Sequence, residues 1–352
     1  MPVLIYFIMF FALLAVSVKG YSQSTPTEFA EMSLQALLNV SIEDDKEQAE
    51  QQKWSFAVQL KAAEFEGYRQ GSRDLSFDQV LYTPGEEERT DSNFPVVPTV
   101  INQYVKLVRL GYQVNPKLQI AAVVPIIRQE TDHISSVPGY SEFLLTSDGV
   151  GDVGLMASYR LTDSPYKNWW LTTGISLPTG SIDQKGDTPR GPGDQQLPYT
   201  MQLGSGTFDF PVELSYQSIG EHEYNLNVSA TIRTGRNDRN YRLGNNYELL
   251  AKYHYRLLES YKLFGAIEFS YSESIHGQDD EIVSNTAFPY AAGIVNPDLY
   301  GGKKLSVTAG GVWSYKDSFS FTSHVSKPVY QHLNGPQPKE KWRVGLQLAY
   351  FL

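Results

Sequence analysis

Nine charged residues could do chemistry in this chain, because each lies on the polar side of a segment whose alternate positions are apolar. They are Arg160, Asp209, Glu213, Arg233, Glu248, Lys252, Arg256, Glu268 and Arg343. Buried charges of opposite sign usually pair, so this set could form a salt-bridge web that fills and stiffens an interior. It could equally line a charged pore. The two interpretations are compatible, and the sequence leaves both open.

Catalytic groups do not come together in the sequence. The chain has no cysteine, which excludes a thiol nucleophile, a disulfide framework and a zinc–thiolate site. His254 and His324 lie on the same polar faces, but no serine and acid stand at a defensible triad spacing, and no H-E-x-x-H motif occurs. We interpret both histidines as hydrogen-bonding groups of the interior, and we predict no enzyme activity, no cofactor and no metal site.

Apolar and polar residues alternate with a period of two from Trp54 to the end of the chain. In 224–233, for example, Tyr224, Leu226 and Val228 alternate with asparagines and a serine. One apolar and one polar face are what a half-buried β-strand needs. Twelve such runs are found, at 54–66, 100–114, 117–130, 151–163, 167–178, 207–219, 222–234, 245–258, 261–274, 303–316, 318–328 and 341–352.

The connections between these runs alternate between long and short. The long ones are 67–99, 131–150, 179–206, 235–244, 275–302 and 329–340, and the others have one to three residues. A soluble β-sandwich, the alternative architecture, has no reason to alternate in this way. Outer-membrane barrels have tight periplasmic turns and long outer loops. We therefore predict an all-β fold, a transmembrane antiparallel β-barrel of about twelve strands over 54–352, with both termini in the periplasm.

The composition agrees with a lipid-facing barrel. Charged residues make up 19% of the chain and aromatic residues 13%, which suits an apolar outer band with aromatic girdles. The net charge of −10 argues against nucleic acid as a partner. The expected partners are membrane lipid, lipopolysaccharide and the barrel assembly machinery, for which Tyr350-Phe351-Leu352 provides a nearly typical aromatic end.

The first 53 residues differ from the rest. Residues 3–18 form an apolar run of signal-peptide length, so 1–22 is predicted to be a signal peptide, with a signal anchor as the alternative. Residues 23–53 are predicted to be a short amphipathic helix and linker. Within them, MSLQALLNV (32–40) resembles the segment after the signal peptide in TonB-dependent receptors, although no plug domain follows.

The amphipathic segment is hypothesised to tuck into the periplasmic mouth of the barrel. A helix of about ten residues is roughly 15 Å long, which suits a narrow lumen. Deleting 24–50 should then raise the single-channel conductance of the correctly folded protein. Unchanged conductance would leave the alternatives, a handle for a periplasmic partner or a disordered leader.

Three glycine-rich segments carry a family resemblance. GVGDVGL (149–155), GISLPTG (174–180) and QLGSG (202–206) resemble, in order and spacing, motifs of a barrel family named for a meta-pathway of phenol degradation. Members of that family are often described as transporters. The resemblance implies an outer-membrane barrel and says less about the substrate. From the residues alone, Gly149 and Gly151 should allow a sharp turn, Asp152 should cap it, and Pro178 should end strand pairing. A ligand-binding role for this region is the alternative.

The function that these observations favour is a passive channel or transporter for a small aromatic or hydrophobic molecule. A barrel of twelve strands is intermediate between one filled with side chains and one with a wide pore. The alternatives are a non-transporting barrel that binds a partner through loops 67–99 and 275–302, and, less favoured, a barrel hydrolase.

Overall fold

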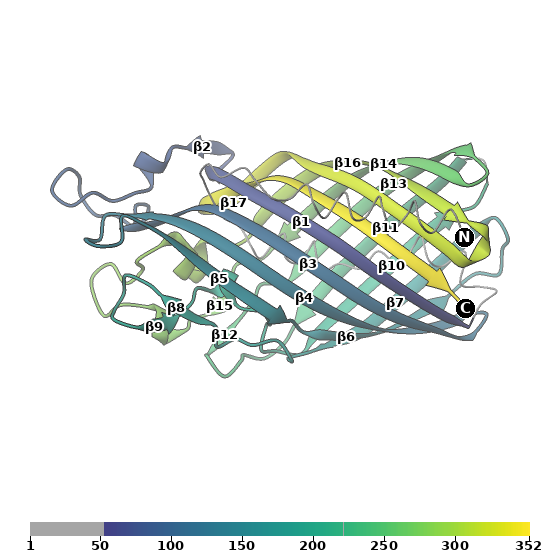
Figure 1. The fold of residues 1–352 in the computed structure, drawn as a ribbon, viewed down its shortest axis with the longest axis horizontal. Coiled ribbons are helices and arrows are strands. Elements are labelled where there is room, and N and C mark those ends of the chain that lie inside the picture. The colour runs from purple at the N-terminus through teal and green to yellow at the C-terminus, as the bar shows by residue number, and fades with distance from the viewer. Residues whose placement is uncertain (1–52, 221) are drawn as a thin grey trace, which may run out of the picture.

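The computed structural model describes residues 53–220 and 222–352. The predicted signal peptide and the predicted amphipathic segment up to residue 52 therefore lie outside the described residues. The described part is a closed antiparallel barrel with long loops at one end (Figure 1). None of the described residues forms a helix long and apolar enough to cross a membrane.

The barrel wall consists of twelve labelled strands. They are β1 (Trp54–Gly71), β3 (Val96–Asn115), β4 (Leu118–Ser135), β5 (Glu142–Val150), β6 (Val153–Arg160), β7 (Lys167–Leu177), β10 (Asp209–Ser218), β11 (His222–Arg233), β13 (Asn246–Leu258), β14 (Tyr261–Ser272), β16 (Gly302–Tyr315) and β17 (Phe319–Phe351). Eleven of them form the ring in the order β17-β16-β14-β13-β11-β10-β7-β6-β4-β3-β1, and β17 pairs with β1 to close it. The twelfth, β5, pairs with β4 beyond β6.

The last strand, β17, crosses the wall twice. Its residues 319–333 pair with β16 and its residues 337–351 pair with β1, both antiparallel. The Nε2 atom of Gln331 in the first leg donates a hydrogen bond to the carbonyl oxygen of Glu340 in the second leg. The other ten strands of the ring cross the wall once, so the chain crosses it twelve times. This even number is what a closed ring of antiparallel neighbours requires.

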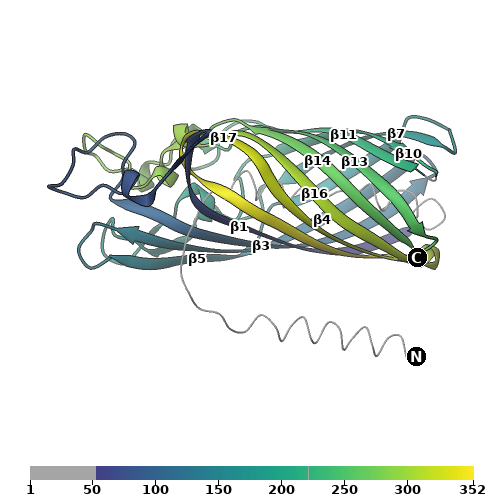
Figure 2. The ribbon, with the colours of Figure 1, turned by 90° about the horizontal axis from the view of Figure 1, so that it is seen from above.

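The remaining elements are short and lie in the connections. They are β2 (Arg73–Leu75), η1 (Phe77–Gln79), β8 (Lys185–Asp187), β9 (Asp194–Gln196), η2 (Tyr199–Met201), β12 (Tyr241–Arg242), β15 (His276–Gly277), η3 (Asp280–Ile282), η4 (Gly293–Val295), η5 (Pro297–Leu299) and η6 (Lys316–Ser318). All but η6 belong to the long loops. We call the end of the barrel that carries them the loop end, and the opposite end the turn end (Figure 2).

Two of the predicted long loops are largely strand. Residues 131–135 extend β4 and 142–150 form β5, while 329–340 belong to β17. The prediction ended these strands too early because it required an apolar outer face. In β4 the outward positions change to Arg128, Glu130 and Asp132, yet the inward side chains of Gln129 and Thr131 stay fully buried. Pairing therefore continues beyond the apolar band.

The facing of the strands agrees with the predicted register. The side chain of Val228 is 54% exposed and points outward, whereas Asn227 and Arg233 are almost fully buried and point into the lumen. Outward aromatic pairs mark the turn end, such as Trp54 with Tyr112, whose ring centroids are 4.7 Å apart. The pair Tyr247 and Tyr271 lies nearer the loop end, at 5.9 Å. The two aromatic bands enclose an apolar belt, as expected of a barrel in lipid.

Both ends of the described barrel lie at the turn end. The backbone nitrogen of Trp54 donates to the carbonyl oxygen of Leu352 at 3.0 Å, and the reverse bond measures 2.8 Å. The first strand, β1, and the second leg of β17 are thereby paired as far as the turn end of the barrel. The wall therefore has no unpaired strand edge.

Candidate functional site in the barrel lumen

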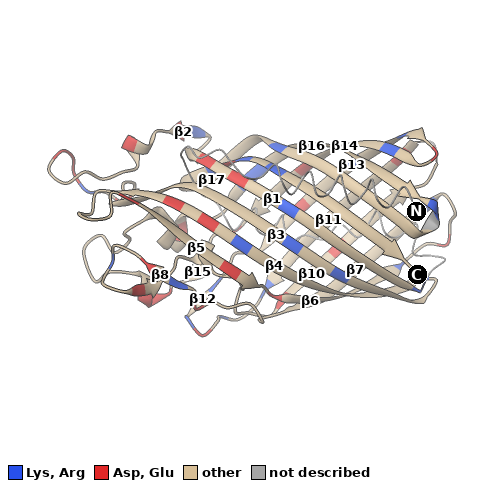
Figure 3. Ribbon diagram, viewed as in Figure 1, with Lys and Arg blue, Asp and Glu red and all other residues tan. Residues whose placement is uncertain are grey.

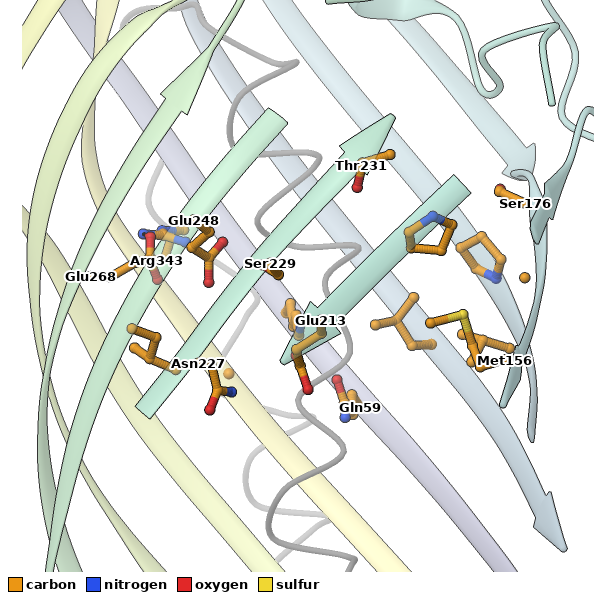
Figure 4. Close-up of a pocket in the computed structure, with 18 of the residues that line it drawn as sticks. Gln59, Met156, Ser176, Glu213, Asn227, Ser229, Thr231, Glu248, Glu268 and Arg343 are labelled. Carbon is orange, nitrogen blue, oxygen red and sulfur yellow. Dashed lines mark hydrogen bonds and ion pairs between the residues drawn. The ribbon is translucent and has the colours of Figure 1, made fainter. Parts of the chain in front are cut away.

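The lumen contains a cavity of about 310 Å³. All eleven strands of the ring and the loop segment from Tyr199 to Ser205 contribute to its wall. Figure 4 shows side chains from several strands pointing into it, with Met156 and Ser176 on one side and Glu248, Glu268 and Arg343 on the other. A cavity of this size, enclosed by a rigid wall, is suited to a small molecule.

The loop-end side of the cavity is an apolar core built from three long loops. The rings of Tyr199 and Tyr241 lie 4.7 Å apart, and those of Tyr199 and Tyr300 lie 5.8 Å apart, both edge to face. Ile282, Ile294 and other buried residues of the same loops pack around them and against the inner wall. Tyr199, Leu203 and Leu243 belong both to this core and to the cavity lining. We call this core the ceiling of the cavity.

Ion pairs tie the same three loops together. Arg239 lies 2.7 Å from Asp183, 3.3 Å from Asp279 and 3.3 Å from Glu281. Burial disfavours the charged guanidinium, but these carboxylates outweigh it and raise the pKa of Arg239. Arg190 donates a further hydrogen bond to the carbonyl oxygen of Glu281 at 2.9 Å. The loops therefore form one connected body above the cavity.

Asp152 anchors this body to the wall. Its carboxylate accepts hydrogen bonds from the backbone nitrogens of Gly180 at 2.8 Å and Ser205 at 2.7 Å, and from the Ser205 hydroxyl at 2.8 Å. A Cβ atom at Gly180 would lie 2.7 Å from the Cα atom of Gly204, so the two backbones meet too closely for any side chain. The three segments that carry the family resemblance thus converge at one point.

The predicted local role of Asp152 was wrong. Its partners lie 28 and 53 residues further along the chain, so it fixes a distant segment instead of capping its own turn. The predicted sharp turn at Gly149 and Gly151 is also absent from the described chain there. β5 and β6 both pair with β4, and one extra residue between them forms a β-bulge.

Six of the nine predicted charged residues line the cavity. They are Asp209, Glu213, Glu248, Lys252, Glu268 and Arg343. Some of them also take part in a salt-bridge web: Arg343 lies 2.7 Å from Glu268 and 2.6 Å from Glu340, and Asp209 lies 3.0 Å from the buried Arg233. Filling and lining the lumen are therefore roles of the same residues.

The other predicted residues lie outside the cavity lining. Arg233 is buried against Asp209 toward the loop end. Arg160 donates to the Oδ1 atom of Asn168 at 2.7 Å, and Arg256 lies 2.9 Å from Glu223, both near the turn end. Both still belong to the inward faces of their strands.

Several charged residues of the lumen were not predicted from the sequence. Lys61 lines the cavity, and Lys304 is fully buried against Glu340. Glu340 fell in a segment predicted to be a loop. Lys61 could have been found from its parity, because it follows Ser55, Ala57 and Gln59 on the inward face of β1.

Comparison with protein-family models and with curated proteins gives no match. Among solved structures, an outer-membrane channel from Pseudomonas putida F1 aligns with a TM-score of 0.58 at 14% identity, covering 86% of this chain and 96% of that one. The chain has the fold of an outer-membrane channel. A mutant of the monoaromatic hydrocarbon channel TodX aligns with a TM-score of 0.47 at 10% identity, covering 86% and 91% of the two chains. The translocator domain of the autotransporter NalP from Neisseria meningitidis reaches 0.46 at 10% identity, covering 92% and 96%.

Proposed function

We propose that the protein is a passive outer-membrane channel for a small aromatic or otherwise hydrophobic molecule. The observation that carries this proposal is the cavity in the lumen, enclosed by the barrel wall and by the apolar ceiling. A structural barrel would be filled with side chains instead. Here Arg343 is paired with Glu268 and Asp209 with Arg233, and these pairs hold the charged side chains near the wall and leave room for a solute.

The proposed orientation places the turn end in the periplasm and the loop end outside the cell. Trp54 and Leu352 lie together at the turn end, and the folded loops lie at the other. This is the usual arrangement of bacterial barrels. A solute entering from outside would therefore meet the ceiling before the cavity.

The cavity offers two kinds of wall. Leu107, Val123 and Met156 from β3, β4 and β6 are apolar, and Leu203 of the ceiling adjoins them. Glu213, Asn227 and Glu248 from β10, β11 and β13 are polar (Figure 4). An apolar surface supplies affinity for a hydrophobic body, and a few polar groups supply orientation. The ceiling must move for a solute to pass, which makes the loops the gating element.

Conductance of the reconstituted protein tests the proposal. The full chain, purified and shown to be folded by its heat-modifiable migration, should give discrete current steps in planar bilayers. Vesicles that contain it should take up toluene faster than protein-free vesicles. Folded protein that neither conducts ions nor accelerates uptake would refute the channel and favour a barrel that only binds a partner.

A further inference from the structure

The lumen between the cavity and the turn end is rich in basic side chains. Arg109, Arg160, Arg256 and Lys262 point inward there, and Lys252 lies at the turn-end side of the cavity lining. Among residues 53–220 and 222–352, Glu223 is the carboxylate that faces this basic ring. Charges of both signs occur elsewhere along the strands and in the loops (Figure 3), so the imbalance is local.

Several hydrogen bonds and ion pairs hold the side chains of the basic ring in place. Glu223 is shared by Arg256 at 2.9 Å and Lys262 at 2.8 Å. Arg109 donates to Ser55 and Gln119, both at 3.3 Å, and Arg160 donates to Asn168 and to the carbonyl oxygen of Ser164. These last four partners are neutral. Among the described residues, Arg109, Arg160, Arg256 and Lys262 thus face one carboxylate, Glu223, whereas Lys252 shares the cavity lining with Glu213 and Glu248.

Aromatic rings lie beside Lys252. The Phe264 ring centroid lies 5.2 Å from the centroid of His254, 6.5 Å from that of His324 and 5.2 Å from the Lys252 ammonium nitrogen. Gly310 makes room for this row, because a Cβ atom there would overlap the Phe264 ring. The Phe264 ring is tilted by 38° against His254 and by 53° against His324, so the row is an angled aromatic surface against which another aromatic ring can pack.

The carboxylates in the middle of the lumen are largely balanced. Glu268 is paired with Arg343, and Lys61 is close enough to Glu248 and Glu268 for their charges to act on it. Glu213 adds one more negative charge on the opposite wall. The lumen therefore changes from an apolar ceiling, through a mixed middle, to a positive region at the turn end.

We infer that the solute is a small amphiphilic anion, an aromatic carboxylate, oriented with its carboxylate toward the basic ring. The apolar part of such a molecule would lie against Leu203 and Met156 or on the Phe264 surface, and Lys252 would meet the charge. A charge-assisted hydrogen bond in a partly desolvated site is stronger than a neutral one. This inference rests on the proposed channel function and narrows its substrate class.

Ion selectivity and block by matched solutes test the inference. In planar bilayers under a KCl gradient, the reversal potential should show preference for chloride. Benzoate should block the open current at a concentration about tenfold lower than benzyl alcohol, corresponding to one charge-assisted contact. Benzylamine, which has the opposite charge, should block least. If folded protein gives no current and does not accelerate toluene uptake either, the channel function itself is refuted, and absence of current with faster uptake refutes the anion inference alone. Current with cation preference, or stronger block by benzylamine, refutes the anion inference alone.

Variants at Lys252 and Arg256 identify the groups responsible. Lys252→Glu should shift the reversal potential toward cations and abolish the preference for benzoate over benzyl alcohol. Arg256→Gln changes a half-exposed side chain near the turn end and should shift the reversal potential toward cations by a smaller amount. This variant keeps the inference testable if Lys252→Glu fails to fold. Lys303→Glu is the matched control, because Lys303 points outward at the loop end. Equal shifts for Lys303→Glu and Lys252→Glu would overturn the assignment to the lumen.

Discussion

Replacement of Val228 by arginine is expected to destabilise the folded barrel by about 2–4 kcal/mol, the cost of a cationic side chain at the middle of a lipid-facing band. Val228 lies on the outer face of β11, paired with Leu214 of β10 and Leu249 of β13, which also point outward. An arginine there must either bury its charge in hydrocarbon or distort the bilayer to reach water. Urea titration of the protein in lipid vesicles, followed by heat-modifiable migration, measures the difference.

Asn227→Arg provides the control for this prediction. Asn227 is the neighbouring residue but faces the lumen, where it lines the cavity. Its replacement should change conductance more than stability. A large loss of stability for Asn227→Arg with none for Val228→Arg would mean that β11 is displaced by one residue, since such a slip exchanges the two faces.

The faces of the strands could be predicted because lipid and lumen select opposite residues at alternate positions. That rule places Val228, Asn227 and Arg233 correctly. It fails where the strand rises above the apolar band, as beyond Glu130 in β4, because both faces are then polar. Glu340 was assigned to a loop for a similar reason, and its buried pairs with Lys304 and Arg343 were missed.

The ceiling could not be predicted from periodicity. Tyr199, Tyr241 and Tyr300 lie in three different loops without a regular pattern, and they meet only because the closed barrel brings those loops over one opening. The role of Asp152 could not be predicted for the same reason, since its hydrogen-bond partners are remote in sequence. The family resemblance indicated which segments matter, but the physical reason is tertiary.

Asp152→Ala is expected to release the loop segment 179–206 from the wall and to raise the open probability of the channel. The substitution removes the acceptor of three hydrogen bonds and leaves the nitrogens of Gly180 and Ser205 without it. Charge-assisted bonds contribute about 1.5–3 kcal/mol each. Water replaces part of this hydrogen bonding, so we expect the closed conformation of the loops to lose about 3 kcal/mol of stability. That loss lowers the ratio of closed to open channels by roughly a hundredfold.

The effect should be confined to the loops, because Asp152 lies in a bulge and the pairing of β4 with β5 and β6 does not depend on its side chain. We therefore expect nearly unchanged urea stability of the barrel, together with more frequent opening and faster proteolysis within 179–206. Asp148→Ala is the matched control, since Asp148 lies on the exposed outer face of β5. If Asp152→Ala opens no more often than Asp148→Ala, the loops are held by the ceiling and by the ion pairs of Arg239 alone. If both open more often, the acidic charge near the wall matters and the hydrogen bonds to Gly180 and Ser205 do not.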